Sequence, residues 1–343
     1  MFDPTPILSG DRRALARLLT RIENGAPEAE AALAALFPHT GRAHTLGVTG
    51  PPGSGKSSLV NELAKALRAR GQTVAIVAVD PSSPFTGGAI LGDRIRMRDL
   101  SGDRGVFIRS MASRGALGGL ARATSEVVTA LDAAGFDKIL IETIGAGQAE
   151  VEIARAAQTV LVVEAPGLGD DVQAIKAGIL EIADVLVVNK ADQPNADAAV
   201  RALRASLDLA HPAARHWTDG AHHHHAPHPD PLPAGEAIWI PPIVQTVAIQ
   251  GKGVDELLEV IEKHRAHLQA SGELARRERE RLSHELETRL RDTLLAGLLA
   301  RLGNGQLSAA LERVLARELD PTTAARQLAE RFKTQDSNSK LET

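Results

Sequence analysis

The chain has 343 residues, enough for one substantial core with further helices attached to it. Its 39 basic and 43 acidic residues leave a formal charge of −4, which gives no electrostatic reason to expect nucleic acid or an anionic membrane as a partner. The absence of cysteine excludes disulfides and thiolate metal sites, and the sequence carries no apolar segment of signal-peptide or membrane-span length, so we expect a cytoplasmic protein.

Residues 10–37 carry the pattern of two short amphipathic helices. Asp11 can cap the first helix, whose apolar face carries Leu15, Leu18, Leu19 and Ile22. The alanine and leucine spacing continues after Pro27. We therefore predict an N-terminal helical arm over residues 1–42.

Seven apolar runs, separated by helical stretches, follow from residue 45 to about residue 265. They are residues 45–50, 73–79, 106–111, 138–143, 159–165, 184–190 and 241–248. Continuous β-branched runs that alternate with helices indicate a parallel sheet covered on both faces. The pattern predicts an α/β domain over residues 43–265, with a mainly parallel central sheet flanked by helices.

A glycine-rich loop follows the first run and reads Gly-Pro-Pro-Gly-Ser-Gly-Lys-Ser. It matches the P-loop pattern GxxxxGK[ST] and lies between a predicted strand and a predicted helix, as that pattern requires. Backbone N–H groups of such a loop surround a phosphate, the lysine adds a charge and the hydroxyl is a ligand for Mg²⁺. The predicted nucleotide-binding residues here are Gly50, Pro52, Gly53, Ser54, Gly55, Lys56, Ser57 and Ser58.

Two loops after strands have the character of nucleotide switches. Asp80 ends the second run and opens a long segment rich in glycine and serine that contains Asp93; a mobile surface loop is the alternative. Glu142 ends the fourth run, where a carboxylate can hold Mg²⁺ through water and the Gly145 N–H can reach the γ-phosphate. Gln148 either orients the attacking water or makes a structural hydrogen bond.

The motif Asn189-Lys190-Ala-Asp192 ends the sixth run and indicates guanine. The carboxylate of Asp192 can accept from guanine N1–H and the 2-amino group, a donor pair that adenine lacks. The stem of Lys190 can stack on the base, and Asn189 can tie the loop together. We therefore predict GTP and GDP as ligands.

Residues 211–230 contain seven of the twelve histidines. A flexible loop of this composition could bind Ni²⁺ or Zn²⁺ weakly, although a variable surface loop is the simpler interpretation. From about residue 255 the sequence is helical, with a leucine at every fourth position from Leu282 to Leu302. This apolar stripe predicts either a homodimer seam or packing on the chain's own domain. We expect a C-terminal helical arm over residues 266–333 and a disordered tail over 334–343.

Several long stretches together resemble the MeaB/ArgK group of GTPases, which accompany adenosylcobalamin-dependent acyl-CoA mutases. The matching stretches include GDRRALARLLTRIE, PHTGRAHTLGVTGPPGSGKSSL, VAVDPSSPFTGGAILGDRIRM, IETIGAGQAEVEIA and EAPGLGDDVQAIKAGILEIADVLVVNKAD. The resemblance covers about residues 10 to 300.

The resemblance implies a SIMIBI-type P-loop GTPase whose C-terminal arm forms a homodimer. It also implies a G-protein chaperone that gates cofactor loading into an acyl-CoA mutase, such as methylmalonyl-CoA mutase or isobutyryl-CoA mutase, and protects or reactivates that enzyme. The mutase in turn would stimulate a slow GTPase. No membrane or nucleic-acid partner is expected.

The family pattern also implies roles for particular residues. A phosphate and Mg²⁺ site would contain Lys56, Ser57, Asp80, Asp93 and Glu142. A third switch over residues 166–177, which senses the partner, would contain Asp170, Asp171 and Lys176. Arg96 and Lys176 could stabilise transition-state charge, although each could equally form a surface ion pair.

The chain departs from the family pattern at two positions that bear on the site. Ile95 stands where the family usually has threonine. Val247 replaces a serine, which leaves the Ala248 N–H as the predicted contact to guanine O6.

Three other functions remain open from the residues. A metal-delivery GTPase for a nickel enzyme would normally use cysteine, which this chain lacks. A small-molecule kinase linked to basic amino-acid transport would phosphorylate an acceptor instead of releasing phosphate. A catalytically idle nucleotide-binding scaffold would bind GTP without any response to a partner.

Overall fold

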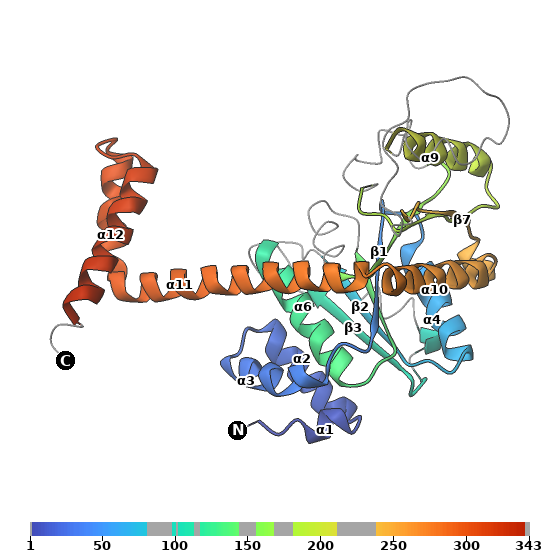
Figure 1. The fold of residues 1–343 in the computed structure, drawn as a ribbon, viewed down its shortest axis with the longest axis horizontal. Helices are drawn as coiled ribbons and strands as arrows, with labels where there is room; N and C mark the ends of the chain where they lie inside the picture. Colours follow the sequence, from blue (N-terminus) through green and yellow to red (C-terminus); the bar gives the residue numbers. More distant parts are fainter. Residues whose placement is uncertain are drawn as a thin grey trace. The chain divides into compact units, whose positions relative to one another are not determined.

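The computed structural model describes residues 2–80, 98–100, 102–112, 117–143, 156–167, 181–210 and 238–339 (Figure 1). Some predicted site residues and the histidine-rich segment 211–230 lie outside these ranges and stay predictions. The site residues concerned are Asp93, Arg96, Gly145, Gln148, Asp170, Asp171 and Lys176.

A seven-stranded parallel sheet organises the described part of the chain. Its strands are β1 (His44–Thr49), β2 (Val74–Asp80), β3 (Val106–Ala112), β4 (Lys138–Thr143), β5 (Thr159–Glu164), β6 (Val185–Val188) and β7 (Ile243–Gln245). They lie in the order β3-β2-β4-β1-β5-β6-β7, and every pairing is parallel. The predicted α/β fold is confirmed, with one strand for each predicted apolar run. All strands end at the same edge, so the loops that follow them can share a site.

One face of the sheet is covered by α2 (Arg12–Glu23), α3 (Pro27–Leu36) and α6 (Leu117–Ala133), as Figure 1 shows. Asp11 caps α2 as predicted, because its carboxylate accepts from the N–H groups of Arg13 and Ala14. The leucine face of α2 shares one core with β2, β3 and β4. Short segments α1 (Thr5–Leu8) and η1 (Phe37–His39) complete this layer. The N-terminal helices, predicted as a helical arm, therefore share the core of the sheet.

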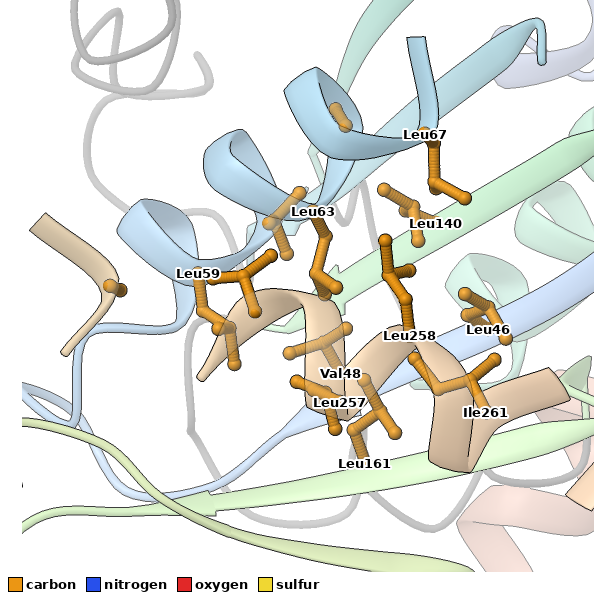
Figure 2. Close-up of a cluster of buried hydrophobic side chains, with 14 of the residues drawn as sticks. Leu46, Val48, Leu59, Leu63, Leu67, Leu140, Leu161, Leu257, Leu258 and Ile261 are labelled. Atoms are coloured by element: carbon orange, nitrogen blue, oxygen red, sulfur yellow. The ribbon is translucent and has the colours of Figure 1, made fainter. Parts of the chain in front are cut away.

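The other face of the sheet is covered by α4 (Lys56–Ala69) and α10 (Val254–Ala270). Figure 2 shows that the apolar faces of these two helices meet over side chains of β1, β4 and β5. The residues are Leu59, Leu63 and Leu67 of α4, Leu257, Leu258 and Ile261 of α10, and Leu46, Val48, Leu140 and Leu161 of the strands. Each fully buried leucine contributes about 1.5–3 kcal/mol relative to exposure, so this cluster fixes the helix that carries the P-loop lysine.

A further helix and two 3₁₀ turns complete the layers. Helix α9 (Ala196–Ala210) packs Leu203 and Leu207 against β5 and β6. Segments η2 (Arg98–Leu100) and η5 (Ala248–Gln250) are single 3₁₀ turns, and η5 follows β7 at the same edge as the P-loop.

The C-terminal region contains α11 (Glu273–Leu315) and α12 (Pro321–Ser339). Residues up to Arg277 belong to the compact unit of the sheet, and residues from Glu278 onward form a second unit. The predicted boundary after residue 265 falls inside α10, which stays in the first unit because its Leu268 is buried. Helix α12 also continues past Lys333, so residues 334–339 are helical where a disordered tail was expected.

The leucines of α11 form its apolar stripe. Leu286 is 69% exposed, and further exposed leucines are Leu290, Leu294, Leu295, Leu299, Leu307, Leu311 and Leu315. Among the described residues, no helix combines the length and apolar character that crossing a membrane requires.

Candidate nucleotide site

The P-loop lies between the end of β1 and the start of α4, and two of its glycines are required by packing. At Gly50, with φ of 138°, an added Cβ would lie 2.1 Å from the carbonyl oxygen of Val163. At Gly55, with φ of 90°, it would lie 2.4 Å from Asn189 Nδ2. A larger residue at either position would push the loop away from its supports, so both the conformation and the close approach require glycine.

Lys56 is the first residue of α4 and is almost fully buried. Its ammonium donates to the carbonyl oxygens of Gly50 at 2.7 Å and Pro51 at 2.8 Å. The charge is thereby held against the loop and beside the N-terminus of α4, whose dipole favours an anion. Pro52 and Gly53 lie at the exposed tip of the loop, and Ser58 is half-buried in the first turn of the helix.

Ser57 and Glu142 meet across the gap between α4 and β4. The Ser57 hydroxyl donates to Glu142 Oε1 at 2.5 Å, and Glu142 is 2% exposed. Asp80 ends β2 beside them, because the preceding Val79 pairs with Thr143 of β4. Three of the four residues predicted to hold Mg²⁺ therefore come from elements that begin or end at one edge of the sheet. The fourth, Asp93, lies outside the described residues.

The donor chemistry of this group fits Mg²⁺. A serine hydroxyl and carboxylate oxygens are the hard ligands that this ion prefers. Within the described ranges, no group of three or more His, Cys, Asp and Glu side chains is arranged for a metal. Mg²⁺ commonly takes only one or two carboxylates and completes its shell with phosphate oxygens and water, so such a cluster is not required.

Asn189 follows β6 and joins three segments of the site. Its Nδ2 donates to the carbonyl oxygen of Ser54 at 2.9 Å. Its Oδ1 accepts from the Thr246 hydroxyl and from the Ala248 N–H, both at 3.1 Å. The buried amide therefore connects the P-loop, the end of β6 and the segment after β7, as the proposed tying role requires.

The Ala248 N–H, which the sequence predicts as a contact to guanine O6, donates to Asn189 Oδ1 in this structure. The reason is that η5 turns back toward β6, which brings this N–H within reach of the buried amide oxygen. A contact with guanine would require the N–H to be shared between the two acceptors.

Lys190 and Asp192 follow Asn189 and are more exposed than it is. We call the contacts of Asn189 with Ser54, Thr246 and Ala248 the Asn189 junction. Lys190 has φ of 56°, and its ammonium donates to the Gly53 carbonyl at 2.8 Å, so its stem runs along the P-loop. The Ala191 N–H donates to the Thr246 carbonyl at 3.0 Å, which anchors the turn. Asp192 is exposed, and its carboxylate is available to a base that lies over the Lys190 stem.

Sequence reasoning missed two residues of this junction. Thr246 bonds Asn189 through its hydroxyl and Ala191 through its carbonyl. Gly253 directly precedes α10 and has φ of 76°, and an added Cβ there would lie 2.1 Å from the Gln245 carbonyl oxygen. The closely spaced pair Gly251 and Gly253 after β7 is the signal that could have indicated this tight return.

Comparisons with known proteins agree with this geometry. The family model described as Methylmalonyl Co-A mutase-associated GTPase MeaB matches residues 15–302. A protein of Pyrococcus horikoshii is 47% identical over 327 residues, which is 94% of this chain and 95% of its own length. The mouse protein named methylmalonic aciduria type A homolog, mitochondrial, is 34% identical over 230 residues, covering 67% of this chain and 51% of its own length.

Among solved structures, the crystal structure of an LAO/AO transport system kinase is similar over nearly the whole chain. It covers 96% of both chains with a TM-score of 0.66 and 27% sequence identity. The likeness therefore extends well beyond the P-loop, over nearly the whole length of the chain.

Proposed function

This chain belongs to the MeaB family of methylmalonyl-CoA mutase-associated GTPases, and on that premise we propose that it is a G-protein chaperone of an adenosylcobalamin-dependent acyl-CoA mutase. It is a GTPase, converting GTP and water to GDP and phosphate. In the proposed role, its nucleotide state gates adenosylcobalamin loading and protects or reactivates methylmalonyl-CoA mutase or a close relative. We place this activity in the cytoplasm and assign it to a homodimer formed by the C-terminal helices.

The observation that carries the nucleotide chemistry is the Asn189 junction. The buried amide of Asn189 joins the P-loop to the segment that ends in Asp192. This connection would set the spacing between the groups that bind phosphate and the groups that bind the base. A guanine nucleotide offers both a triphosphate and the paired N1–H and 2-amino donors that this spacing serves. The family description, with its explicit mutase association, supports the choice of partner.

The residues of the site have separate proposed roles in GTP hydrolysis. P-loop amides and Lys56 neutralise the charge that spreads over the γ-phosphoryl oxygens as the bond to GDP breaks. Ser57 and Glu142, with Asp80 and Asp93 as further proposed ligands, would hold Mg²⁺. That ion would supply positive charge that offsets the negative charge of the phosphates. Gln148 is the proposed water-positioning residue, and Arg96 or Lys176 the proposed cation that a bound partner brings into place.

The exposed leucines of α11 support the homodimer. A stripe of this length on an isolated helix would leave a large apolar surface in water. Pairing with the same stripe of a second copy would bury it by the symmetric arrangement most common among homo-oligomers.

A second candidate is a small-molecule kinase, which the similarity to the LAO/AO transport system kinase favours. The two readings differ in product. A GTPase releases inorganic phosphate in proportion to GDP, whereas a kinase forms a phosphorylated acceptor and releases none. Nickel delivery has less support, because the chain has no cysteine to supply thiolate ligands.

The test combines binding and turnover with purified methylmalonyl-CoA mutase. We expect the mutase to bind this chain in the presence of a non-hydrolysable GTP analogue and to raise phosphate release at least tenfold. Cofactor transfer into the mutase should then depend on the nucleotide. If GTP is hydrolysed but neither this mutase nor isobutyryl-CoA mutase binds or stimulates, the chaperone role is wrong and the GTPase assignment stands.

A further inference from the structure

Strands β1 and β4 separate at the nucleotide site. Their backbone ladder ends with the pair Val48 and Glu142. One residue further, Thr49 leads directly into the P-loop, while Thr143 ends the strand that carries Glu142. The spacing between the phosphate loop and the Glu142 carboxylate therefore depends on what holds the two strands together just beyond the ladder.

A side-chain hydrogen bond lies at this position. The Thr143 hydroxyl donates to the Thr49 hydroxyl oxygen at 3.1 Å, and the two residues are 1% and 0% exposed. Threonine is stiff at χ1, so a bond between two such side chains holds their backbones at a narrow range of separations. Backbone hydrogen bonds connect β1 and β4 as far as Glu142, and the Thr49–Thr143 side-chain bond connects the two strands one residue further.

Each member of the pair is also fixed on its other side. Thr49 pairs with Val162 of β5, and the next residue, Gly50, packs against the Val163 carbonyl. Thr143 pairs with Val79 of β2. The hydroxyl bond therefore joins the half of the sheet that carries the P-loop to the half that carries Glu142 and Asp80.

We propose that Thr49 and Thr143 are positioning residues for GTP hydrolysis, which keep Glu142 within hydrogen-bonding distance of Ser57. The proposal rests on the GTPase activity and is independent of the mutase partner. The Ser57–Glu142 contact joins the same two halves of the sheet, and an error of about 1 Å in such a site can lower a rate by about 100-fold.

The pair should affect turnover much more than nucleotide binding. The contacts that hold the P-loop to the guanine motif run through Asn189 and Lys190 and do not involve either threonine. Thr143→Val removes the hydroxyl and keeps the branched shape, whereas Thr143→Ser keeps the hydroxyl. Thr45→Val is a matched control, since Thr45 is a buried threonine two alternations earlier on the same face of β1.

The experiment measures kcat, KM for GTP, GDP affinity and the Mg²⁺ concentration for half-maximal rate in the full chain. For Thr143→Val we expect kcat to fall about tenfold and the Mg²⁺ requirement to rise, with KM and GDP affinity within about twofold. Thr143→Ser should recover most of kcat, and Thr45→Val should match the wild type. The same series at Thr49, as Val and Ser, repeats the test from the other strand.

In the double variant Thr49→Val/Thr143→Val, kcat should fall no further than in either single variant, because each single change already removes the hydrogen bond. The proposal would be overturned if the fold-decrease of kcat in the double variant equalled the product of the decreases in the two single variants. An unchanged kcat in both valine variants, or an equal loss in Thr45→Val, would also overturn it. Absence of GTP hydrolysis in the wild-type chain would instead overturn the GTPase assignment.

Discussion

The two edges of the central sheet both bury charged side chains, but they satisfy them differently. At the carboxyl edge, Lys56 and Lys190 donate to backbone carbonyls of the P-loop, and Asn189 bonds two further backbone groups. At the amino edge, charged and polar side chains bond chiefly to one another beneath α10. The first arrangement holds loops that can surround a ligand, and the second closes the end of the fold.

At the amino edge, hydrogen bonds and ion pairs link seven side chains in one continuous series, which we call the buried polar chain. His44 Nδ1 lies 3.1 Å from Lys138 Nζ, and its Nε2 lies 2.9 Å from the Thr159 hydroxyl. That hydroxyl lies 2.8 Å from His264 Nδ1. The complete order is Glu262, Lys138, His44, Thr159, His264, Asp184 and Arg277. An ion pair therefore closes each end of this series of side chains.

The polarity of this chain follows from its donors. A lysine ammonium can only donate, so His44 accepts at Nδ1 and carries its proton on Nε2, which donates to Thr159. Thr159 then donates to His264 Nδ1, and His264 Nε2 faces the Asp184 carboxylate at 3.2 Å. Burial, followed by the charge of Lys138, lowers the pKa of His44 to about 2, so this histidine stays neutral in the fold.

The comparison shows that burial of charge does not by itself mark a functional site. Burial opposes ionisation of Asp184, yet hydrogen bonds from His264 and Arg277 lower its pKa overall. Removing one partner from such a buried pair destabilises the fold, because the other charge is left uncompensated. Substitutions at the carboxyl edge should therefore change nucleotide chemistry, and substitutions at the amino edge should change stability.

The largest effect is expected at the carboxyl edge from Lys56→Ala. Loss of the cation that faces the phosphates should lower kcat for GTP by at least about 1000-fold while the chain stays folded. Phosphate release and circular dichroism measure the two properties. Lys263→Ala, on the exposed side of α10, is the control and should keep the wild-type rate. A rate near normal for Lys56→Ala would refute the site.

At the amino edge, Asp184→Asn should produce the complementary result. It removes the buried carboxylate that pairs with Arg277, which keeps only its pair with Glu273, and should lower the free energy of unfolding by about 3 kcal/mol in a urea titration. GDP affinity should change little. Asp255→Asn breaks the exposed pair with Arg70 and should have little effect on stability. A large loss of GDP affinity in folded Asp184→Asn would contradict the division between the edges.

A smaller and more selective effect is expected from Asp192→Asn. The amide lacks the charge that accepts from guanine N1–H and the 2-amino group, so the preference for GTP over ATP should fall by about 10- to 100-fold. Competition binding with both nucleotides measures the ratio. Asp197→Asn, in the first turn of α9, is the matched control. Unchanged discrimination in Asp192→Asn would remove the residue from the base site.

The smallest effect concerns pH and His44. Between pH 6.5 and about 2, the unfolded chain binds a proton at His44 that the folded chain does not. The free energy of unfolding therefore decreases by about 1.4 kcal/mol for each unit by which the pH is lowered. His44→Gln should remove this contribution, and its unfolding free energy should fall less steeply between pH 6.5 and pH 5. The exposed His39→Gln should keep the wild-type slope. Equal slopes for His44→Gln and wild type would show that His44 does not titrate in this way.

Much of the carboxyl edge could be predicted from the sequence because its motifs are contiguous. The P-loop from Gly50 to Ser57 and the segment from Asn189 to Asp192 each lie within a few residues, directly after strands of strong apolar character. A phosphate or a base needs several groups from one loop, so these groups are adjacent in sequence. The tail beyond Lys333 shows the weaker case, since polar composition alone did not exclude a helix.

The sequence by itself determined the strands, the helices between them and the two nucleotide motifs, since each depends on local periodicity or on a short run of residues. Only the tertiary structure decided that the N-terminal helices share the sheet's core and that the Ala248 N–H bonds Asn189. It also decided that His44, Lys138 and His264 belong to one series of linked polar side chains. Those contacts join residues far apart along the sequence. They follow from the order of strands in the sheet, which is set by packing summed over the whole core and not by any single segment.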